Sequence, residues 1–169
     1  IRQRLGDAAG VAVVLNNLGY MAGERGDLDA ARRLYEQSLT ARRELGDKLG
    51  LAVSLNSLAG LYARLNEASE AVAAYAESAR IAAGIGNSRE VAAALAGLST
   101  VVPGDLEGHR LALVAETIVD RYGAAIDAEV RELLRQGQLR GAPGPQGGEL
   151  PESVPEAPLT DLVAWALDR

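Results

Sequence analysis

Apolar side chains recur along the first part of the chain at the three- and four-residue spacing of helix faces. One group consists of Val14, Leu15, Leu18 and Ala22, and the next consists of Ala31, Leu34, Tyr35, Ser38 and Leu39. Each group predicts an amphipathic helix, because this spacing places the side chains on one side of a helix. Gly26 can end the first helix and Asp27 can cap the second, so we expect a helical hairpin.

The hairpin pattern returns with an offset of 40 residues. Leu5-Gly6-Asp7 recurs as Leu45-Gly46-Asp47 and then as Ile85-Gly86-Asn87. The segment Ile1–Arg4 before the first of these joints is predicted to be the end of a preceding helix. A period of roughly 20–50 residues predicts a solenoid, because one hairpin cannot bury its apolar face alone and stacks on its neighbours.

The two full copies resemble the tetratricopeptide repeat family. The residues that carry the likeness are Leu15, Leu18-Gly19, Ala22, Gly26-Asp27, Ala31, Tyr35 and Ser38 in unit one, and Leu55, Leu58-Ala59, Tyr62, Asn66-Glu67, Ala71, Tyr75 and Ser78 in unit two. The resemblance implies an all-α fold, a right-handed α-solenoid of TPR-like hairpins with a divergent C-terminal helical cap. The 40-residue period and the Leu-Gly-Asp joints are similar to those in the C-terminal parts of large bacterial transcriptional regulators.

Small residues are expected to let the two helices of each hairpin approach closely. We expect Gly19 to face Ala31 and Ala59 to face Ala71, while Leu and Tyr side chains fill the space between successive hairpins. Asn66 takes the place of the turn glycine in unit two, and asparagine tolerates positive φ.

The pattern changes after the second unit, which sets the predicted boundaries. TPR-like repeats cover residues 1–102, divergent capping helices cover 103–136, a Pro/Gly-rich loop covers 137–158, and a docking helix covers 159–169. Within the cap we expect helices at about 105–122 and 124–136. Thr160 is the predicted N-cap of the last helix, whose apolar side chains must dock because so short a helix is unstable alone.

Charge and composition exclude several classes of function. The net charge of −6 falls entirely in residues 101–169, which carry 6 Lys+Arg against 12 Asp+Glu, while residues 1–100 carry 11 of each. No basic stripe is present, so we expect no direct nucleic-acid binding. No apolar run reaches the roughly 18 residues of a membrane span, and cysteine is absent, so we expect no membrane insertion and a cytoplasmic location. The first residue is not methionine, and we expect a fragment of a longer protein.

No catalytic or cofactor-binding constellation is predicted. His109 is the only histidine and there is no cysteine, so neither a metal site nor a bound cofactor is expected. Ser54, Ser57 and Ser78 lie in repeat helices without a base at a catalytic spacing. The sequence therefore predicts a protein that is not an enzyme.

The candidate site residues lie on the first helix of each unit, which in the resembled family lines a concave groove. The predicted partner-binding residues are Asn16, Tyr20, Glu24, Asn56, Arg64 and Thr100. Asparagine pairs with peptide groups as donor and acceptor, tyrosine offers an amphipathic surface, and Arg and Glu fix the charge register. An alternative for Asn17 and Asn56 is that they only hydrogen-bond within the helix array.

The leading hypothesis is a protein–protein interaction module, a scaffold or sensor forming the C-terminal part of a larger bacterial regulatory protein. The partner is a protein or peptide in the concave groove. Two alternatives stay open. The groove could sense a small-molecule or peptide effector for a transcriptional regulator, or apolar surface at the N-terminal end could make the chain self-associate as a homodimer.

Overall fold

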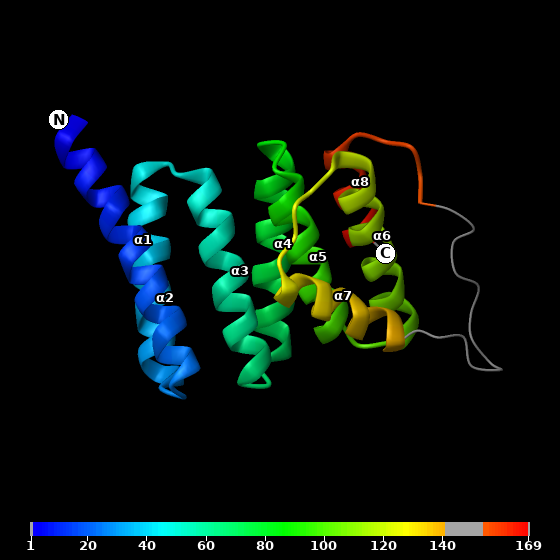
Figure 1. Ribbon diagram of the computed structural model, residues 1–169, viewed down its shortest axis with the longest axis horizontal. Helices are drawn as coiled ribbons and strands as arrows, with labels where there is room; N and C mark the ends of the chain where they lie inside the picture. The colour runs from blue at the N-terminus through cyan, green and yellow to red at the C-terminus, as the bar shows by residue number, and fades with distance from the viewer. Residues whose placement is uncertain (1, 141–153, 169) are drawn as a thin grey trace.

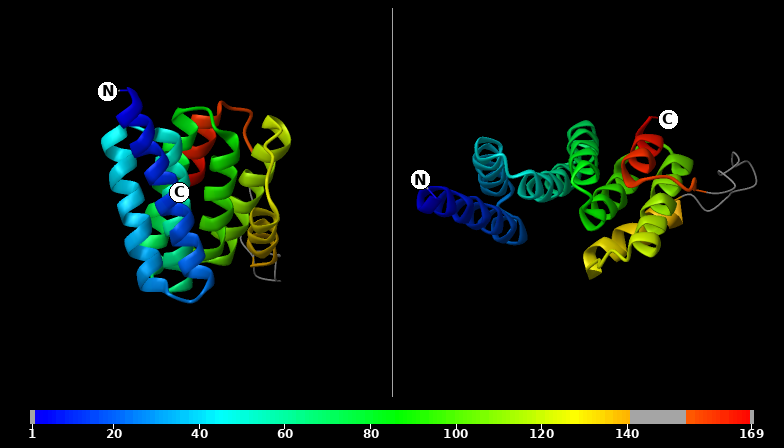
Figure 2. Two further views of the ribbon diagram at one scale, coloured as in Figure 1. Left: turned by 60° about the vertical axis from the view of Figure 1, so that its left-hand side comes forward. Right: turned by 90° about the horizontal axis from the view of Figure 1, so that it is seen from above.

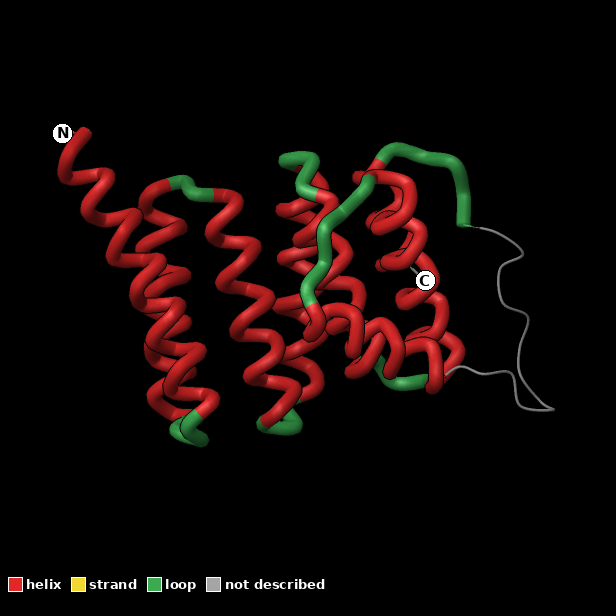
Figure 3. The backbone as a smooth tube through the Cα atoms, in the orientation of Figure 1, coloured by secondary structure: helices red, strands yellow, loops and turns green. Residues whose placement is uncertain are grey.

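The structure, a computed structural model, describes residues 2–140 and 154–168. Helices and loops make up this described part, without a strand (Figure 3). The helices are α1 (Arg2–Glu24), α2 (Leu28–Leu45), α3 (Lys48–Arg64), α4 (Ala68–Gly84), α5 (Ser88–Val101), α6 (Asp105–Tyr122), α7 (Ala128–Arg140) and α8 (Leu159–Leu167). The predicted loop 137–158 begins too early, because α7 continues to Arg140, and residues 141–153 of it lie outside the described residues.

Three antiparallel hairpins, α1–α2, α3–α4 and α5–α6, stand side by side and form an α-solenoid (Figure 1). Seen from above, α1, α3 and α5 lie on one side and α2 and α4 on the other, while α6 lies beside α5 at the end of the row (Figure 2). The predicted all-α, TPR-like solenoid is therefore confirmed.

The four joints from α1 to α5 each contain a left-handed residue, as the sequence predicts, and a side chain caps the next helix at three of them, through Asp27, Asp47 and Asn87, but not at Glu67. Gly46 has φ of 67°, and the Asp47 carboxylate after it accepts a hydrogen bond of 2.9 Å from the Gly50 N–H. Asn66 takes the same left-handed role with φ of 59°. Because these four joints reverse the chain in the same way, successive hairpins stack with the same face toward the same side, whereas the α5–α6 joint uses an extended Val102 instead.

The first predicted joint does not form. α1 runs without a break from Arg2 through Gly6 and Asp7, so in the structure these residues belong to α1 and form no joint.

The packing inside the first hairpin differs by one helical turn from the expectation. A Cβ on Gly19 would lie 2.8 Å from the Tyr35 ring, so Gly19 faces Tyr35 and not Ala31. Ala31 lies instead beside Gly23, at 3.8 Å from the corresponding position. Gly23 lies four residues after Gly19 on α1, and Ala31 lies four residues before Tyr35 on α2. Because the two helices are antiparallel, both contacts belong to the same packing register.

The C-terminal helices pack on opposite sides of the last hairpin. α7 crosses α5 and α6, and α8 packs against α4 and α6 (Figures 1 and 2). α6 matches its predicted bounds, but α7 begins at Ala128, four residues later than predicted. The Asp127 carboxylate accepts a 3.0 Å hydrogen bond from the Val130 N–H, and this cap sets the start of α7.

The predicted cap of α8 is wrong, although the helix docks. Pro158 holds the N-cap position and no side chain caps the helix, while Thr160 hydrogen-bonds Asp161. Leu162 and Ala166 are buried in α8, which packs on α4 of the second repeat unit as well as on α6 of the predicted cap. A buried arginine of α6, Arg110, donates a 3.0 Å hydrogen bond to the Ala166 carbonyl and so fixes the C-terminal end of α8.

Candidate partner-binding groove

A groove of about 540 Å³ lies along the side of the solenoid formed by α1, α3 and α5. α3 supplies its floor through Val53, Asn56, Ser57, Gly60, Leu61 and Arg64. Tyr20 and Glu24 of α1 line one end, and residues 127–136 around α7 line the other. The groove is therefore framed by four helices, one of which crosses the solenoid.

Five of the six predicted partner-binding residues line this groove, and Asn16 does not. Asn16 is only 9% exposed, and its Oδ1 accepts a 2.9 Å hydrogen bond from Ser54 Oγ. Its Nδ2 donates to Ser57 Oγ at 3.5 Å. This asparagine ties α1 to α3 below the groove, which places it in the helix array.

The side-chain amide of Asn56 uses its nitrogen in a hydrogen bond between helices, while its oxygen has no hydrogen-bond partner in the described part of the chain. Its Nδ2 donates to Glu90 Oε2 at 3.1 Å, which joins α3 to α5. Its Oδ1 is buried and lacks a hydrogen-bond partner among the described residues. The alternative role within the helix array thus holds for the amide nitrogen, while the oxygen keeps an unused capacity to accept.

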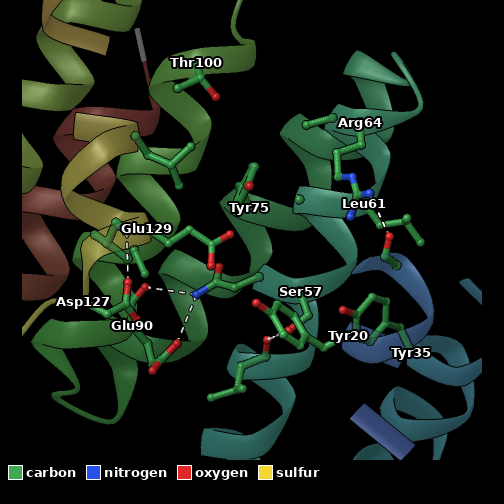
Figure 4. Close-up of a pocket in the computed structure, with 18 of the residues that line it drawn as sticks. Tyr20, Tyr35, Ser57, Leu61, Arg64, Tyr75, Glu90, Thr100, Asp127 and Glu129 are labelled. Atoms are coloured by element: carbon green, nitrogen blue, oxygen red, sulfur yellow. Dashed lines mark hydrogen bonds between the residues drawn. The ribbon is translucent and has the colours of Figure 1, made fainter. Parts of the chain in front are cut away.

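The remaining predicted residues line the groove with their polar groups partly engaged. Arg64 Nη2 donates a 2.8 Å hydrogen bond to the Gly23 carbonyl, and Nη1 lies 3.8 Å from Glu24 Oε1. Thr100 Oγ1 donates to the Gly97 carbonyl of its own helix at 2.7 Å. Tyr20 is 55% exposed and stands at the rim (Figure 4). These contacts hold the side chains in place at the groove surface.

Two tyrosines that the sequence analysis treated only as packing residues also line the groove. Tyr35 of α2 and Tyr75 of α4 are each 5% exposed, and the structure gives neither hydroxyl a hydrogen bond within the described residues. They occupy equivalent positions 40 residues apart. Both come from the outer helices and reach between the inner ones to the groove, where Figure 4 shows them.

Glycines on the inner helices leave the space through which the two tyrosine side chains reach the groove. A Cβ on Gly97 of α5 would lie 2.2 Å from Cζ of Tyr75, and one on Gly60 of α3 would lie 3.5 Å from its hydroxyl. Gly19 of α1 takes the same role beside Tyr35. The available sequence signal was the pairing of these small residues with tyrosines at the repeat offset, because glycine leaves the space that a ring can fill.

Burial is the main reason that the pKa of Tyr35 and of Tyr75 is raised to about 12, so both phenols are protonated at neutral pH. The Glu129 charge contributes to both increases, and the Arg64 charge opposes the one at Tyr35. A neutral hydroxyl can both donate and accept a hydrogen bond. The groove therefore presents two protonated phenols to whatever lies in it.

α7 gives the groove an acidic wall that the sequence analysis missed. Asp127 and Glu129 line the groove at this end. Arg89 bridges Asp127 at 3.4 Å and Glu90 at 3.3 Å, whereas Glu129 has no ion pair with a described residue. Together the groove has four carboxylates, Glu24, Glu90, Asp127 and Glu129, against the two guanidinium groups of Arg64 and Arg89.

Other kinds of site were sought in the same described residues. No group of three or more His, Cys, Asp or Glu side chains there is arranged to hold a metal ion. His109 instead pairs its Nδ1 with the Gln138 carbonyl at 3.0 Å. None of the described helices combines the length and the apolar character that crossing a bilayer requires.

A sequence model of the tetratricopeptide repeat family matches residues 10–84. This segment covers the described hairpins α1–α2 and α3–α4, which supports their identification as tetratricopeptide repeats. Repeats of this family generally mediate protein–protein interaction and are non-catalytic. No curated protein and no solved structure matches the chain significantly.

Gly97→Ala should destabilise the protein by about 1–3 kcal/mol, because the added methyl group forces the Tyr75 ring to move. The control is Gly10→Ala in α1, where a Cβ meets nothing within 4 Å and the better helix propensity should leave stability unchanged or raised. Urea denaturation measures both. Equal changes in stability for the two substitutions would contradict the contact between Gly97 and Tyr75. A smaller side chain in place of Tyr75 should restore part of the stability that Gly97→Ala loses.

Tyr35 and Tyr75 should lose their protons near pH 12, above the ordinary pKa of 10.0. Since the unfolded chain ionises first, the free energy of unfolding should fall between these values, by up to about 1.4 kcal/mol per pH unit for each tyrosine. Below pH 10 both states keep the protons, so these groups cause no change there. Phenolate absorbance should show late titrations that Tyr75→Phe removes in part, and a titration curve unchanged by this substitution would contradict the raised pKa.

Proposed function

We propose that the chain is a protein-interaction module whose groove binds an extended segment of a partner protein. The observation that carries this proposal is a pair of tyrosines, Tyr35 and Tyr75, whose rings are buried and whose hydroxyls line the groove without a hydrogen bond to a described residue. Neither hydroxyl is among the buried polar atoms that lack a partner, so both oxygens are open to the groove and free to donate to or accept from a ligand there.

An extended peptide has the chemistry that these groups require. Its carbonyl oxygens accept hydrogen bonds from the hydroxyls of Tyr35 and Tyr75, and its N–H groups donate to carboxylate oxygens that line the groove. The exposed Tyr20 ring adds apolar contact area at the rim.

The wider role is proposed from the sequence. The 40-residue period and the Leu-Gly-Asp joints resemble those of large bacterial transcriptional regulators, so we place this module in the C-terminal part of a cytoplasmic regulatory protein. There it acts as the scaffold or sensor that recruits a partner. Tyr20, Glu24, Asn56, Arg64 and Thr100 are the residues proposed to contact that partner.

Replacing Asn56 and Arg64 together by alanine should weaken partner binding at least about tenfold, because two polar contacts on the groove floor are lost. The ligands are peptides selected from a random dodecamer display library on the wild-type chain, and calorimetry gives their affinity. The matched control replaces Arg43 and Glu77, an exposed ion pair between α2 and α4 outside the groove. Circular dichroism verifies folding, and equal affinity for both double variants would reject the groove as the binding surface.

A second candidate function is self-association, favoured by the outer face of α1. Val11, Val14 and Leu18 are 54%, 55% and 44% exposed on this face. The residues 40 positions after Val14 and Leu18 are Ser54 and Leu58 of α3. These two side chains are only 0% and 5% exposed, because α2 packs against α3. α7 and α8 cover the other end of the solenoid, so two copies would meet α1 against α1.

Leu18→Glu should abolish such a dimer, because it places a charge in the centre of the apolar face. Sedimentation equilibrium measures the oligomeric state over a range of protein concentrations. Leu49→Glu is the control, since Leu49 is also exposed (46%) but lies at the start of α3. A wild-type chain that stays monomeric at every concentration would rule out this function.

A further inference from the structure

The carboxylates of the groove differ in whether they already have a cation. Glu24 lies 3.8 Å from Arg64, and both Glu90 and Asp127 lie within ion-pair distance of Arg89. Glu129 lines the same groove and makes no ion pair or hydrogen bond with another described residue. By contrast Glu132, one turn further along α7 and not part of the groove lining, is paired with Arg135 at 2.6 Å.

A second unpaired group lies close to Glu129. Figure 4 shows its side chain extending from α7 toward Tyr75 of α4. Tyr75 is 95% buried, and its hydroxyl, which lacks a hydrogen bond to described residues, faces the groove beside Gly60. The Glu129 charge also raises the pKa of Tyr75, in addition to the larger effect of burial, which agrees with this proximity. A carboxylate and a phenol oxygen from two different helices thus converge on one end of the groove.

The combination selects a cation over an anion. A lysine ammonium has only donors, and an arginine guanidinium likewise, so each needs a set of acceptors such as a carboxylate and a phenol oxygen. A partner carboxylate would instead enter a groove that holds four carboxylates, while both groove arginines are already engaged. Like charges in an interface cost affinity, so an acidic segment is disfavoured here.

We propose that the α7 end of the groove binds a lysine or arginine side chain of the partner segment, between the Glu129 carboxylate and the Tyr75 hydroxyl. The cation donates one hydrogen bond to each of these oxygens. The rest of the segment runs along α3 toward Tyr35 and Tyr20, so the basic side chain fixes its register. This inference rests on the proposed function, because it names the chemistry of the partner that the same groove recognises.

The experiment uses the random dodecamer library as the source of probes. Peptides are selected on the wild-type chain and retained if the Asn56 and Arg64 double alanine variant weakens their binding. We expect Lys or Arg at one fixed position among them. Replacing that residue by norleucine, which keeps the aliphatic chain and removes the charge, should weaken binding about tenfold in calorimetry.

Variants of the protein test the partner of that cation. Glu129→Gln should weaken the basic peptide about tenfold and leave its norleucine version unchanged, because only the charged pair is lost. Glu132→Gln, the matched control on the same helix, should change neither. Tyr75→Phe keeps the ring in place and should weaken the basic peptide by removing one acceptor. Selection on Glu129→Lys should recover Asp or Glu at the position where the wild type selects Lys or Arg.

The outcomes separate this inference from the proposed function. Groove peptides without a preferred basic position, or with equal affinity for Glu129→Gln and the wild type, would overturn the cation site and leave the groove as the binding surface. Selection that yields no peptide sensitive to the Asn56 and Arg64 change would overturn the proposed function and this inference together.

Discussion

The structure depends on tyrosine rings that pass between neighbouring helices at positions where the facing residue is glycine. Tyr75 fills the space that a Cβ on Gly97 would occupy, and Tyr35 does the same beside Gly19. The rings thereby pack adjacent hairpins together, and they also reach from the outer helices into the groove. Interiors are close-packed, so even one added methyl group at these glycines has to displace a ring. Stacking and groove chemistry are thus set by one contact.

The repeat units were predictable because their residues act locally or through a fixed period. Gly46 with Asp47, and Asn66 in its turn, determine the joints, and the 40-residue offset then places each hairpin on the next. α7 was not predictable in the same way. It falls outside the repeat, so no offset specifies where it crosses α5 and α6, and its cap at Asp127 shifts its start. The groove floor therefore followed from sequence, whereas the acidic wall required the fold.

The same distinction explains the errors at individual positions. Asn16 and Asn56 are equivalent in the repeat, and sequence alone gives both to the groove. In the structure Asn16 accepts a hydrogen bond from Ser54 of the next repeat unit. The residue that would donate to Asn56 in the same way lies 40 positions after Ser54, and it is Ala94, which has no hydroxyl. Asn56 therefore lacks that donor and keeps an unused oxygen. A difference of one hydroxyl on a neighbouring helix decides which asparagine is internal, and the repeat pattern does not contain it.

Tyrosine at positions 35 and 75 is difficult to explain by packing alone. An apolar ring could fill the same space, and the hydroxyl adds no hydrogen bond to a described residue. The hydroxyl is present twice, at equivalent positions, and in both cases it lines the groove and is not among the buried polar atoms that lack a partner. The two phenols therefore connect the packing of the solenoid to recognition, since the residues that hold the hairpins together also present the polar groups of the groove.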